Sequence, residues 1–197
     1  MILLINICKE SLHYYEFVKP IEDILKKENI RYLRRHYTKI KGGDYGNINK
    51  IIICGTSLKD NEFVKNINSF RWLSLSKKPI LGICGGMQII GLIFDLDKQV
   101  KELDIKNDFK HILKKKTEIG FYKEFFEKEF LGLKGEPEVY HLHNNYIDFS
   151  RLKNFEVFSK SGNVVQAVKY KDKNIYGVLF HPEVRNKEMI VRFAKDC

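Results

Sequence analysis

Cys84 and the glycines around it form the part of the sequence whose residue types and spacing point most directly to chemistry. The segment Gly82-Ile83-Cys84-Gly85-Gly86 has the form G-x-C-x-G, the thiol counterpart of the nucleophile elbow, in which a sharp turn joins a strand to a helix. This turn strains the backbone at the nucleophile, so the residues two before and two after it must be small. A cysteine at the start of a helix is favoured as a thiolate, and the next amide can stabilise an oxyanion. The pattern predicts a nucleophilic Cys84, against the alternative of a glycine-rich turn around an inert cysteine.

A histidine near the end of the chain supplies the proton-transfer group that a thiolate requires. Phe180-His181-Pro182-Glu183 closes the last apolar run, and in a parallel sheet this strand end lies on the same carboxyl edge as Cys84. His181 and Glu183 are two positions apart, so in extended geometry both side chains lean to one side and the carboxylate can orient the imidazole. We therefore predict a triad of Cys84, His181 and Glu183, although a lone histidine in a strand is otherwise commonly a packed or surface residue.

These motifs resemble those of the class I glutamine amidotransferases, which carry G-x-C-x-G-x-Q and H-P-E. Two intermediate segments also match in order, so the resemblance covers nearly the whole chain. The segment 118–121 reads Glu-Ile-Gly-Phe and resembles the family's E-x-G-aromatic segment. The segment 140–145 reads Tyr-His-Leu-His-Asn-Asn and resembles the S-H-G-D or N-H-G-F stretch of the glutamine pocket. The resemblance implies Cys84 as nucleophile, His181 as acid and base, and Glu183 as its orienting carboxylate.

The resemblance also implies a substrate pocket and an oxyanion hole. The implied glutamine-binding residues are Gln88, His143, Asn144 and Asn145, and the implied oxyanion donors are the backbone amides of Gly85, Gly55 and Thr56. Three residues depart from the family pattern. Thr56 replaces the second glycine of a G-G-P loop, Asn144 replaces a glycine, and Leu142 replaces a polar residue. Since Asn tolerates left-handed backbone better than most residues, we expect the backbone at Asn144 to be preserved.

The activity that the resemblance implies is hydrolysis of L-glutamine to glutamate and ammonia through a thioester on Cys84, without metal or organic cofactor. Ammonia is expected to pass to a synthetase or synthase on a partner chain. Within the family, the pattern is nearest to the amidotransferase subunits of GMP synthetases. Two alternatives remain open, namely a stand-alone γ-glutamyl hydrolase or peptidase using the same triad, and a catalytically silent regulatory or binding subunit.

The apolar pattern predicts a fold that places these residues together. Continuous apolar runs predict buried strands at 1–7, 30–37, 51–54, 79–83, 164–169 and 175–180, and helical spacing predicts helices at 17–28, 61–75, 87–94 and 186–194. Strands that are apolar throughout are typical of a parallel sheet covered on both faces. We expect an α/β fold with an open, mostly parallel central sheet and helices on both faces, the flavodoxin-like arrangement that the resemblance implies. The stretch from about 95 to 150 is expected to cover one side of the sheet and to include antiparallel strands.

The composition fits one folded domain over residues 1–197. Hydrophobic residues make up 44% of the 197 residues, which is enough to fill a core. The longest apolar runs fall short of the roughly 20 residues that span a bilayer, and the N-terminal run lacks the features of a signal peptide. We therefore expect a cytoplasmic protein without a membrane segment.

The remaining cysteines, Cys8, Cys54 and Cys197, are isolated, with no C-x-x-C pair and no cluster of cysteine and histidine at zinc-ligand spacing. A disulfide framework and a zinc ribbon are therefore not expected. Cys54 is expected to pack beneath the oxyanion loop, and no function is expected of Cys8 or Cys197.

Lysine and arginine outnumber aspartate and glutamate by 35 to 25, which gives a formal charge of +10. A basic surface suits RNA or an acidic partner, but acidic residues are interleaved through most of the chain. We expect a solvated lysine-rich surface that can dock an acidic partner, and no nucleic-acid binding. The two basic clusters comprise Arg31, Arg34, Arg35, His36, Lys39 and Lys41, and Lys110, His111, Lys114, Lys115 and Lys116.

Overall fold

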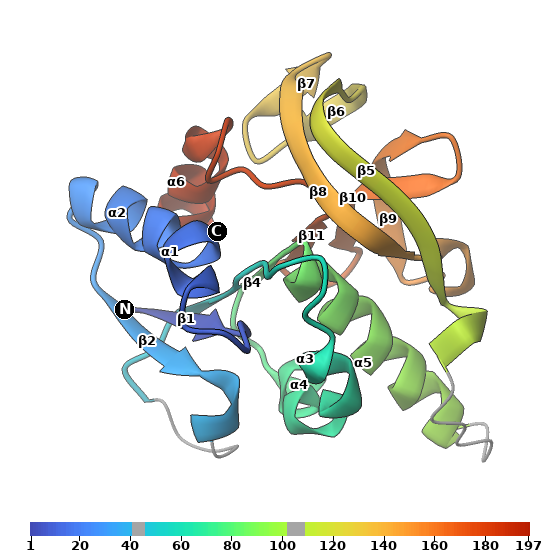
Figure 1. Ribbon diagram of the computed structural model, residues 1–197, viewed down its shortest axis with the longest axis horizontal. Helices are drawn as coiled ribbons and strands as arrows, with labels where there is room; N and C mark the ends of the chain where they lie inside the picture. The colour runs from blue at the N-terminus through green and yellow to red at the C-terminus, as the bar shows by residue number, and fades with distance from the viewer. Residues whose placement is uncertain (41–45, 102–108) are drawn as a thin grey trace.

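A central sheet of seven strands, in the order β2-β1-β3-β4-β11-β10-β9, organises the structure (Figure 1). The computed structural model describes residues 1–40, 46–101 and 109–197, so Lys41 of the first basic cluster lies outside the described residues. The strands of the central sheet are β1 (Ile2–Asn6), β2 (Tyr32–His36), β3 (Lys50–Ile53), β4 (Ile80–Ile83), β9 (Phe155–Ser161), β10 (Val164–Tyr170) and β11 (Ile175–Val178). The first five in spatial order run parallel, whereas β10 and β9 are antiparallel to their neighbours. The expected mostly parallel α/β sheet is confirmed.

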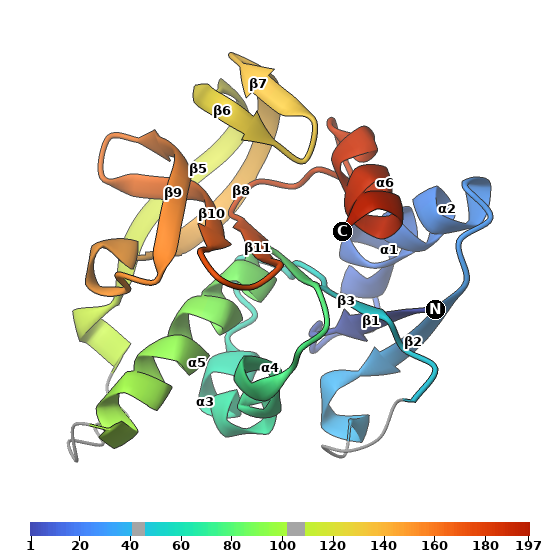
Figure 2. The same ribbon diagram turned by 180° about the vertical axis from the view of Figure 1, so that it is seen from behind.

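Helices cover both faces of the sheet, as Figures 1 and 2 show from opposite sides. One face is covered by α1 (His13–Phe17), α2 (Lys19–Lys27) and α6 (Lys187–Asp196), and the other by α3 (Glu62–Lys65), α4 (Trp72–Leu75) and α5 (Gly85–Lys101). Successive residues of a strand point to opposite faces. Accordingly Ile2 and Leu4 belong to the cluster with α2 and α6, while Leu3 and Ile5 belong to the cluster with α5. This double burial explains why the sequence of β1 is apolar throughout.

The middle of the chain forms two antiparallel sheets of two strands each beside the central sheet. One pairs β5 (Leu113–Lys123) with β8 (Glu138–Ile147), and the other pairs β6 (Phe126–Phe130) with β7 (Leu133–Gly135). The antiparallel strands were expected, but the expectation that this segment covers one side of the sheet is wrong. Ile147 packs in the core on the α5 side, whereas Phe126 and Val139 pack in the core on the α6 side. Because β5 and β8 are long, they reach both layers at the edge of the sheet.

Several predicted elements have different bounds in the structure. The expected helix over 61–75 is broken into α3, a 3-10 turn (Ile67–Phe70) and α4. The first break coincides with Asn66, whose side chain donates to the carbonyl of Glu62, because asparagine competes for helical backbone hydrogen bonds. The helix expected over 17–28 is divided into α1 and α2, and the helix expected over 87–94 extends from Gly85 to Lys101. The edge strand β9 was not predicted.

The basic clusters are partly neutralised by acidic neighbours. Arg34 lies 3.0 Å from Glu22, and Lys116 lies 2.8 Å from Glu118. Within the described residues, no helix is both long enough and apolar enough to cross a membrane.

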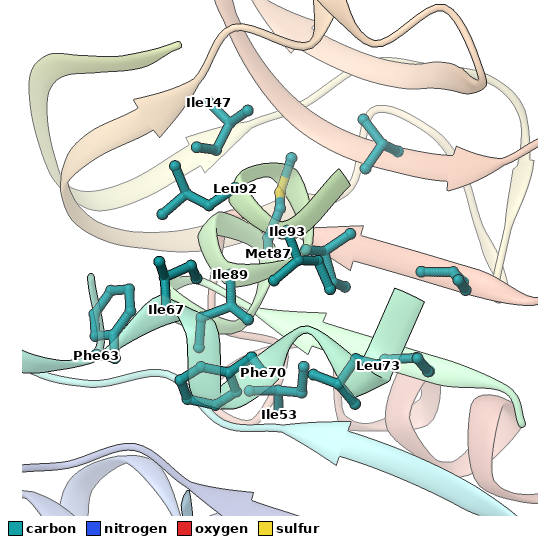
Figure 3. Close-up of a cluster of buried hydrophobic side chains, with 14 of the residues drawn as sticks. Ile53, Phe63, Ile67, Phe70, Leu73, Met87, Ile89, Leu92, Ile93 and Ile147 are labelled. Carbon is teal, nitrogen blue, oxygen red and sulfur yellow. The ribbon is translucent and has the colours of Figure 1, made fainter. Parts of the chain in front are cut away.

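Close packing of α5 against the sheet fixes the geometry of the strand-helix turn at Cys84. Figure 3 shows the buried side chains around this helix, including Ile53 of β3 and Ile147 of β8. A Cβ on Gly86 would collide with the carbonyl oxygen of Ile53 and would lie 2.9 Å from its Cβ. A Cβ on Gly91 would lie 2.6 Å from the nearest side-chain carbon of Ile147. The two glycines therefore let α5 lie directly against β3 and β8.

We expect Gly86→Ala to lower the free energy of unfolding by about 1–3 kcal/mol, the usual range for overpacking. A Cβ on Gly86 would meet backbone atoms of Ile53, which cannot rotate out of the way as a side chain can. The steric cost therefore outweighs the gain of about 1 kcal/mol in helix propensity. Urea unfolding measures the difference. The matched control is Gly91→Ala, which meets only the side chain of Ile147 and is expected to cost less. A Gly86→Ala protein as stable as the control would contradict this explanation.

Candidate active site

Cys84 occupies a strained turn between β4 and α5. Its φ of 49° lies in the left-handed region, which non-glycine residues adopt only when the surroundings enforce it. Backbone hydrogen bonds enforce it here, because the Cys84 amide donates to the carbonyl of Val178 (2.7 Å) and the amide of Gln88 donates to the Cys84 carbonyl (3.1 Å). A Cβ on Gly82 would lie 2.6 Å from the carbonyl group of Gly86. The turn has the backbone geometry of a nucleophile elbow, with the cysteine at the N-terminus of a 17-residue helix.

His181 and Glu183 meet in a turn that follows β11. The strand ends at Val178, and residues 182–184 form a turn, so the assumption that strand geometry persists to Glu183 is wrong. The turn nevertheless brings the carboxylate to the ring, with His181 Nδ1 lying 2.7 Å from Glu183 Oε1. The His181 amide donates to the carbonyl of Tyr140 in β8 (2.8 Å). Both side chains of the pair are about 1% exposed, so the ion pair is shielded from water.

The imidazole of His181 is held in a charged environment beside Cys84. Burial alone lowers the pKa of His181, but the charges of Glu183 and Cys84 and the hydrogen bond to Glu183 raise it well above its usual value. A Cβ built on Gly55 would lie 2.7 Å from Cε1 of His181 and 3.4 Å from Cβ of Cys84, so the three residues adjoin one another. With Nδ1 bound to Glu183, Nε2 of His181 is the nitrogen available for proton transfer.

The loop after β3 places Gly55 and Thr56 next to this pair. The buried hydroxyl of Thr56 donates to Asp60 (2.8 Å), so its hydrogen bond stabilises the loop. Asp60 also accepts from the amide of Lys9. Asp60 was missed by the sequence interpretation, because a bond between two side chains four residues apart in a loop has no sequence signal of its own. Glycine is required at 55 because the His181 ring lies against its Cα.

Two further cysteines lie behind this loop. Cys8 is buried with its thiol 3.7 Å from the carbonyl of Gly55, and burial raises its pKa to about 11. Cys54 is fully buried and packs in the core on the α6 side. Burial raises the Cys54 pKa well above its usual value. These thiols are packed as small apolar groups.

Strand β8 forms the opposite wall of the site. The thiol of Cys84 lies 3.6 Å from the carbonyl of Leu142, and Gln88 Nε2 donates to the carbonyl of Asn145 (3.0 Å). Asn144 Nδ2 donates to the carbonyl of Leu58 (2.7 Å), which ties β8 to the loop after β3. Asn144 lies in the strand, and among the described residues only Asn29, Cys84 and Leu131 combine a side chain with a left-handed φ. Thus Asn144 has no left-handed backbone to preserve, contrary to expectation.

His143 also lies in this wall, with its ring buried beside Glu118. It is 1% exposed, and Nε2 lies 3.1 Å from Oε2 of Glu118 in β5. Burial is the main cause that lowers the His143 pKa to about 4, so the ring is neutral at pH 7. Its pairing with Glu118 was not foreseen.

The cavity at Cys84 is small, with a volume of about 20 Å³. A cavity of roughly 10–15 Å³ holds one water molecule, so this cavity has room for little more. The residues that line it are Thr56, Ser57, Leu58, Asp60, Asn61, Phe63, Cys84, Gly85, Gln88, Leu142, His143, Asn144 and Asn145.

A larger groove of about 1040 Å³ lies elsewhere, lined among others by Trp72, Phe94 and Tyr170. It contains neither the elbow nor the histidine pair. Because catalysis needs a nucleophile and a base within reach of each other, the small cavity at Cys84 is the candidate active site.

Known proteins resemble this chain in sequence and in fold. The sequence profile of the family described as "Glutamine amidotransferase class-I" matches residues 14–197. A glutamine-hydrolyzing GMP synthase subunit of Ignicoccus hospitalis is 31% identical over 153 residues, which cover 74% of this chain and 72% of the relative. The corresponding protein of Methanosphaera stadtmanae is 34% identical over 125 residues, covering 60% of this chain and 61% of that relative.

Solved structures share the fold at low sequence identity. A Thermoplasma acidophilum protein provisionally described as one subunit of GMP synthase aligns with a TM-score of 0.78 and 20% identity, covering 98% of this chain and 91% of that protein. The glutaminase domain of Trypanosoma brucei CTPS, solved with bound acivicin, aligns with a TM-score of 0.71 and 11% identity over 98% and 91% of the two chains. Because the profile match extends over most of the chain, the chain belongs to the class I glutamine amidotransferase family.

Proposed function

We propose that this chain hydrolyses the side-chain amide of L-glutamine to glutamate and ammonia, with Cys84 as nucleophile. The observation that carries the proposal is the left-handed Cys84 at the start of α5, next to a histidine whose Nδ1 is bound by Glu183 at 2.7 Å. A thiolate beside an oriented imidazole at a helix N-terminus is the arrangement that covalent catalysis on an acyl group requires.

The proposed reaction has two halves that use His181 in opposite directions. The Cys84 thiolate attacks the carboxamide carbon, and the amides of Gly85 and of Gly55 or Thr56 stabilise the oxyanion. His181 then protonates the departing nitrogen as the C–N bond breaks, which releases ammonia and leaves a γ-glutamyl thioester. Water loses a proton to His181 and attacks the thioester, and glutamate leaves as the thiol is restored. Each proton transfer contributes about 10²–10⁴ in rate.

Glutamine is proposed to bind between α5 and β8. Gln88, His143, Asn144 and Asn145 line the small cavity there. Of these, Gln88 and Asn145 are joined by a hydrogen bond of 3.0 Å. Because the cavity holds little more than a water molecule, we propose that the loop carrying Leu58 separates from Asn144 when the substrate enters, which would break the 2.7 Å bond between them.

The destination of the ammonia is proposed from the relatives. Several proteins similar to this chain are described as subunits of glutamine-hydrolyzing GMP synthases, and the matched region spans 61% of the length of the first of them. We propose that a synthetase on a partner chain, acting in GMP synthesis in the cytoplasm, receives the ammonia. Free ammonia is mostly protonated near neutral pH and is then no nucleophile. The released ammonia can therefore serve in a synthesis only when it is delivered to a bound acceptor.

We expect Cys84→Ala to reduce ammonia release from L-glutamine by about 10³-fold or more, since the variant lacks the nucleophile on which both steps depend. The measurement is coupled detection of ammonia and glutamate, together with mass spectrometry of acid-quenched protein for a γ-glutamyl adduct on Cys84. The control is Cys8→Ala, which removes a nearby buried thiol and is expected to retain activity. Equal release by wild type and Cys84→Ala would exclude the mechanism, and release from γ-glutamyl peptides but not glutamine would indicate the hydrolase alternative.

We expect Glu183→Gln to lower the pKa of His181, because the carboxylate charge favours the imidazolium. A histidine whose folded pKa is raised stabilises the fold fully below its unfolded pKa of about 6.5, and this contribution disappears as pH rises through the folded pKa. The stability lost in the variant is therefore larger at pH 6 than at alkaline pH. NMR titration of the ring and urea unfolding at both pH values measure these effects. We also expect kcat/KM to fall by about 10²–10⁴, and an unchanged His181 pKa would contradict the assigned role.

A further inference from the structure

A second buried cluster of ionisable side chains lies on the face of β8 that carries His141 and His143. Glu118 and Glu124 approach these histidines, and all four residues are between 0% and 6% exposed. Oε2 of Glu118 lies 3.0 Å from Nδ1 of His141 and 3.1 Å from Nε2 of His143, and Oε1 of Glu124 lies 3.4 Å from Nε2 of His141. Glu118, Glu124 and His141 have no role in the proposed reaction, whereas His143 also lines the cavity at Cys84.

The antiparallel pairing of β5 with β8 assembles this cluster. Glu118 is the register partner of His143, and Gly120 is the partner of His141. Because alternate residues of a strand point to the same face, Glu118 of β5 lies on the face that His141 and His143 share. The ring of Tyr122 stacks on His141 with centroids 4.4 Å apart, and Gln166 of β10 donates from Nε2 to Oε2 of Glu118 at 3.0 Å.

The hydrogen bonds of this cluster do not balance. Among the described residues, Nε2 of His141, both ring nitrogens of His143, Oε1 of Glu124 and Oε1 of Gln166 are buried without a hydrogen-bond partner. If the His141 proton is on Nδ1, it satisfies Glu118 but leaves the Nε2 lone pair facing Glu124. If the proton is on Nε2, it satisfies Glu124 but leaves Nδ1 facing the Glu118 carboxylate, and two acceptors 3.0 Å apart need a cation between them.

The charges do not balance either. Two buried carboxylates, Glu118 and Glu124, face the imidazoles of His141 and His143. The nearby cation, Lys116, lies 2.8 Å from the other oxygen of Glu118, and its side chain is 48% exposed. The buried carboxylates therefore need a further positive charge, which is either a proton within the cluster or a bound cation.

The spacing of the polar atoms fits a small divalent metal ion. Ligand atoms bound at 2.0–2.1 Å in a tetrahedron are about 3.3 Å apart. The two histidine nitrogens lie 3.0 and 3.1 Å from Oε2 of Glu118, and the ligand atoms of all three residues lie within 4.8 Å of one another. Rotating the Gln166 amide by half a turn places its unpartnered oxygen where its nitrogen now lies, 3.0 Å from Oε2 of Glu118.

We propose that Glu118, His141 and His143 form a binding site for a divalent transition metal of the Zn²⁺ type, with Gln166 as fourth ligand. Neutral imidazoles and a carboxylate are ligands that this class of ion prefers. Oε1 of Glu124 lies 3.4 Å from Nε2 of His141, the place from which a carboxylate usually accepts a hydrogen bond of a metal-bound histidine. The ion compensates both buried carboxylates.

The role of this site is structural, since its residues are buried and lie on three different strands, β5, β8 and β10. The ion ties β8 to β5 and β10. The same stretch of β8 supplies the carbonyl of Tyr140 to the His181 amide and the carbonyl of Leu142 to the Cys84 thiol. A bound metal therefore stiffens the wall against which the candidate triad is held.

The test uses Cys84→Ala as host protein, because the wild-type thiolate and His181 can themselves bind Zn²⁺. The host is stripped with a chelator and titrated with Zn²⁺, and retained metal per chain is measured by mass spectrometry after gel filtration. We expect one Zn²⁺ per chain and a melting temperature raised by roughly 5–10 °C at a free Zn²⁺ concentration about 100 times the dissociation constant. Titration with Co²⁺ is expected to give the d–d absorption of a four-coordinate ion.

Two variants in this host locate the ion. His141→Phe keeps a ring to stack on Tyr122 but removes the ligand nitrogen, so stoichiometric binding is expected to disappear. Glu124→Gln keeps all ligands and is expected to weaken Zn²⁺ binding about 10- to 100-fold. The matched control is His36→Phe on β2, which is expected to bind as the host does.

Failure of the host to retain Zn²⁺ or to give the Co²⁺ spectrum overturns the proposal, and a proton on Glu124 then completes the cluster. Binding that is equal in the host and in His141→Phe also overturns it, because the ion then lies elsewhere. If circular dichroism shows that His141→Phe is unfolded, Glu124→Gln decides in its place, and unweakened binding by that variant overturns the proposal. Since every readout is metal content, spectrum or melting temperature, the result is independent of glutaminase activity.

Discussion

The left-handed backbone at Cys84 is the constraint on which the rest of the site depends. A side chain in this conformation is unfavourable by about 1–3 kcal/mol, and the fold maintains it by packing α5 directly against β3 and β4. Glycine at 82 and 86 makes that approach possible, because a Cβ at either position would meet backbone atoms. The strain places the sulfur at the start of α5, where peptide dipoles favour the thiolate. The stable packing of α5 on the central sheet therefore fixes the position of the Cys84 sulfur.

Strand β8 is the second support of the site, and it belongs to a different part of the fold. It contacts the elbow through the Leu142 carbonyl, α5 through Gln88, and the loop after β3 through Asn144. Its other face carries the buried cluster with His141 and Glu118. The parallel sheet therefore positions Cys84 and His181, whereas the antiparallel pair of β5 and β8 encloses them and leaves a cavity of about 20 Å³.

The two buried histidines His181 and His143 have pKa values that are shifted in opposite directions. His181 faces the charges of Glu183 and Cys84, which raise its pKa well above the usual value against the effect of burial. His143 also faces a carboxylate, but burial dominates and lowers its pKa to about 4. A histidine that carries a proton suits acid catalysis, whereas a neutral histidine suits hydrogen bonding or metal coordination. Burial alone therefore does not determine the role of a histidine, because the balance of neighbouring charges decides it.

The sequence by itself determined the strand-turn-helix at Cys84 and the parallel sheet, since glycine spacing and continuous apolar runs are local signals. It also indicated His181 and Glu183, although a turn after β11 and not an extended strand brings their side chains together. Only the tertiary structure decided what depends on pairing between distant segments. The register of β5 with β8 places Glu118 against His143, and the strand geometry of β8 directs the Asn144 side chain to Leu58. Such contacts leave no periodic trace in the sequence, because they join residues through space and not along the chain.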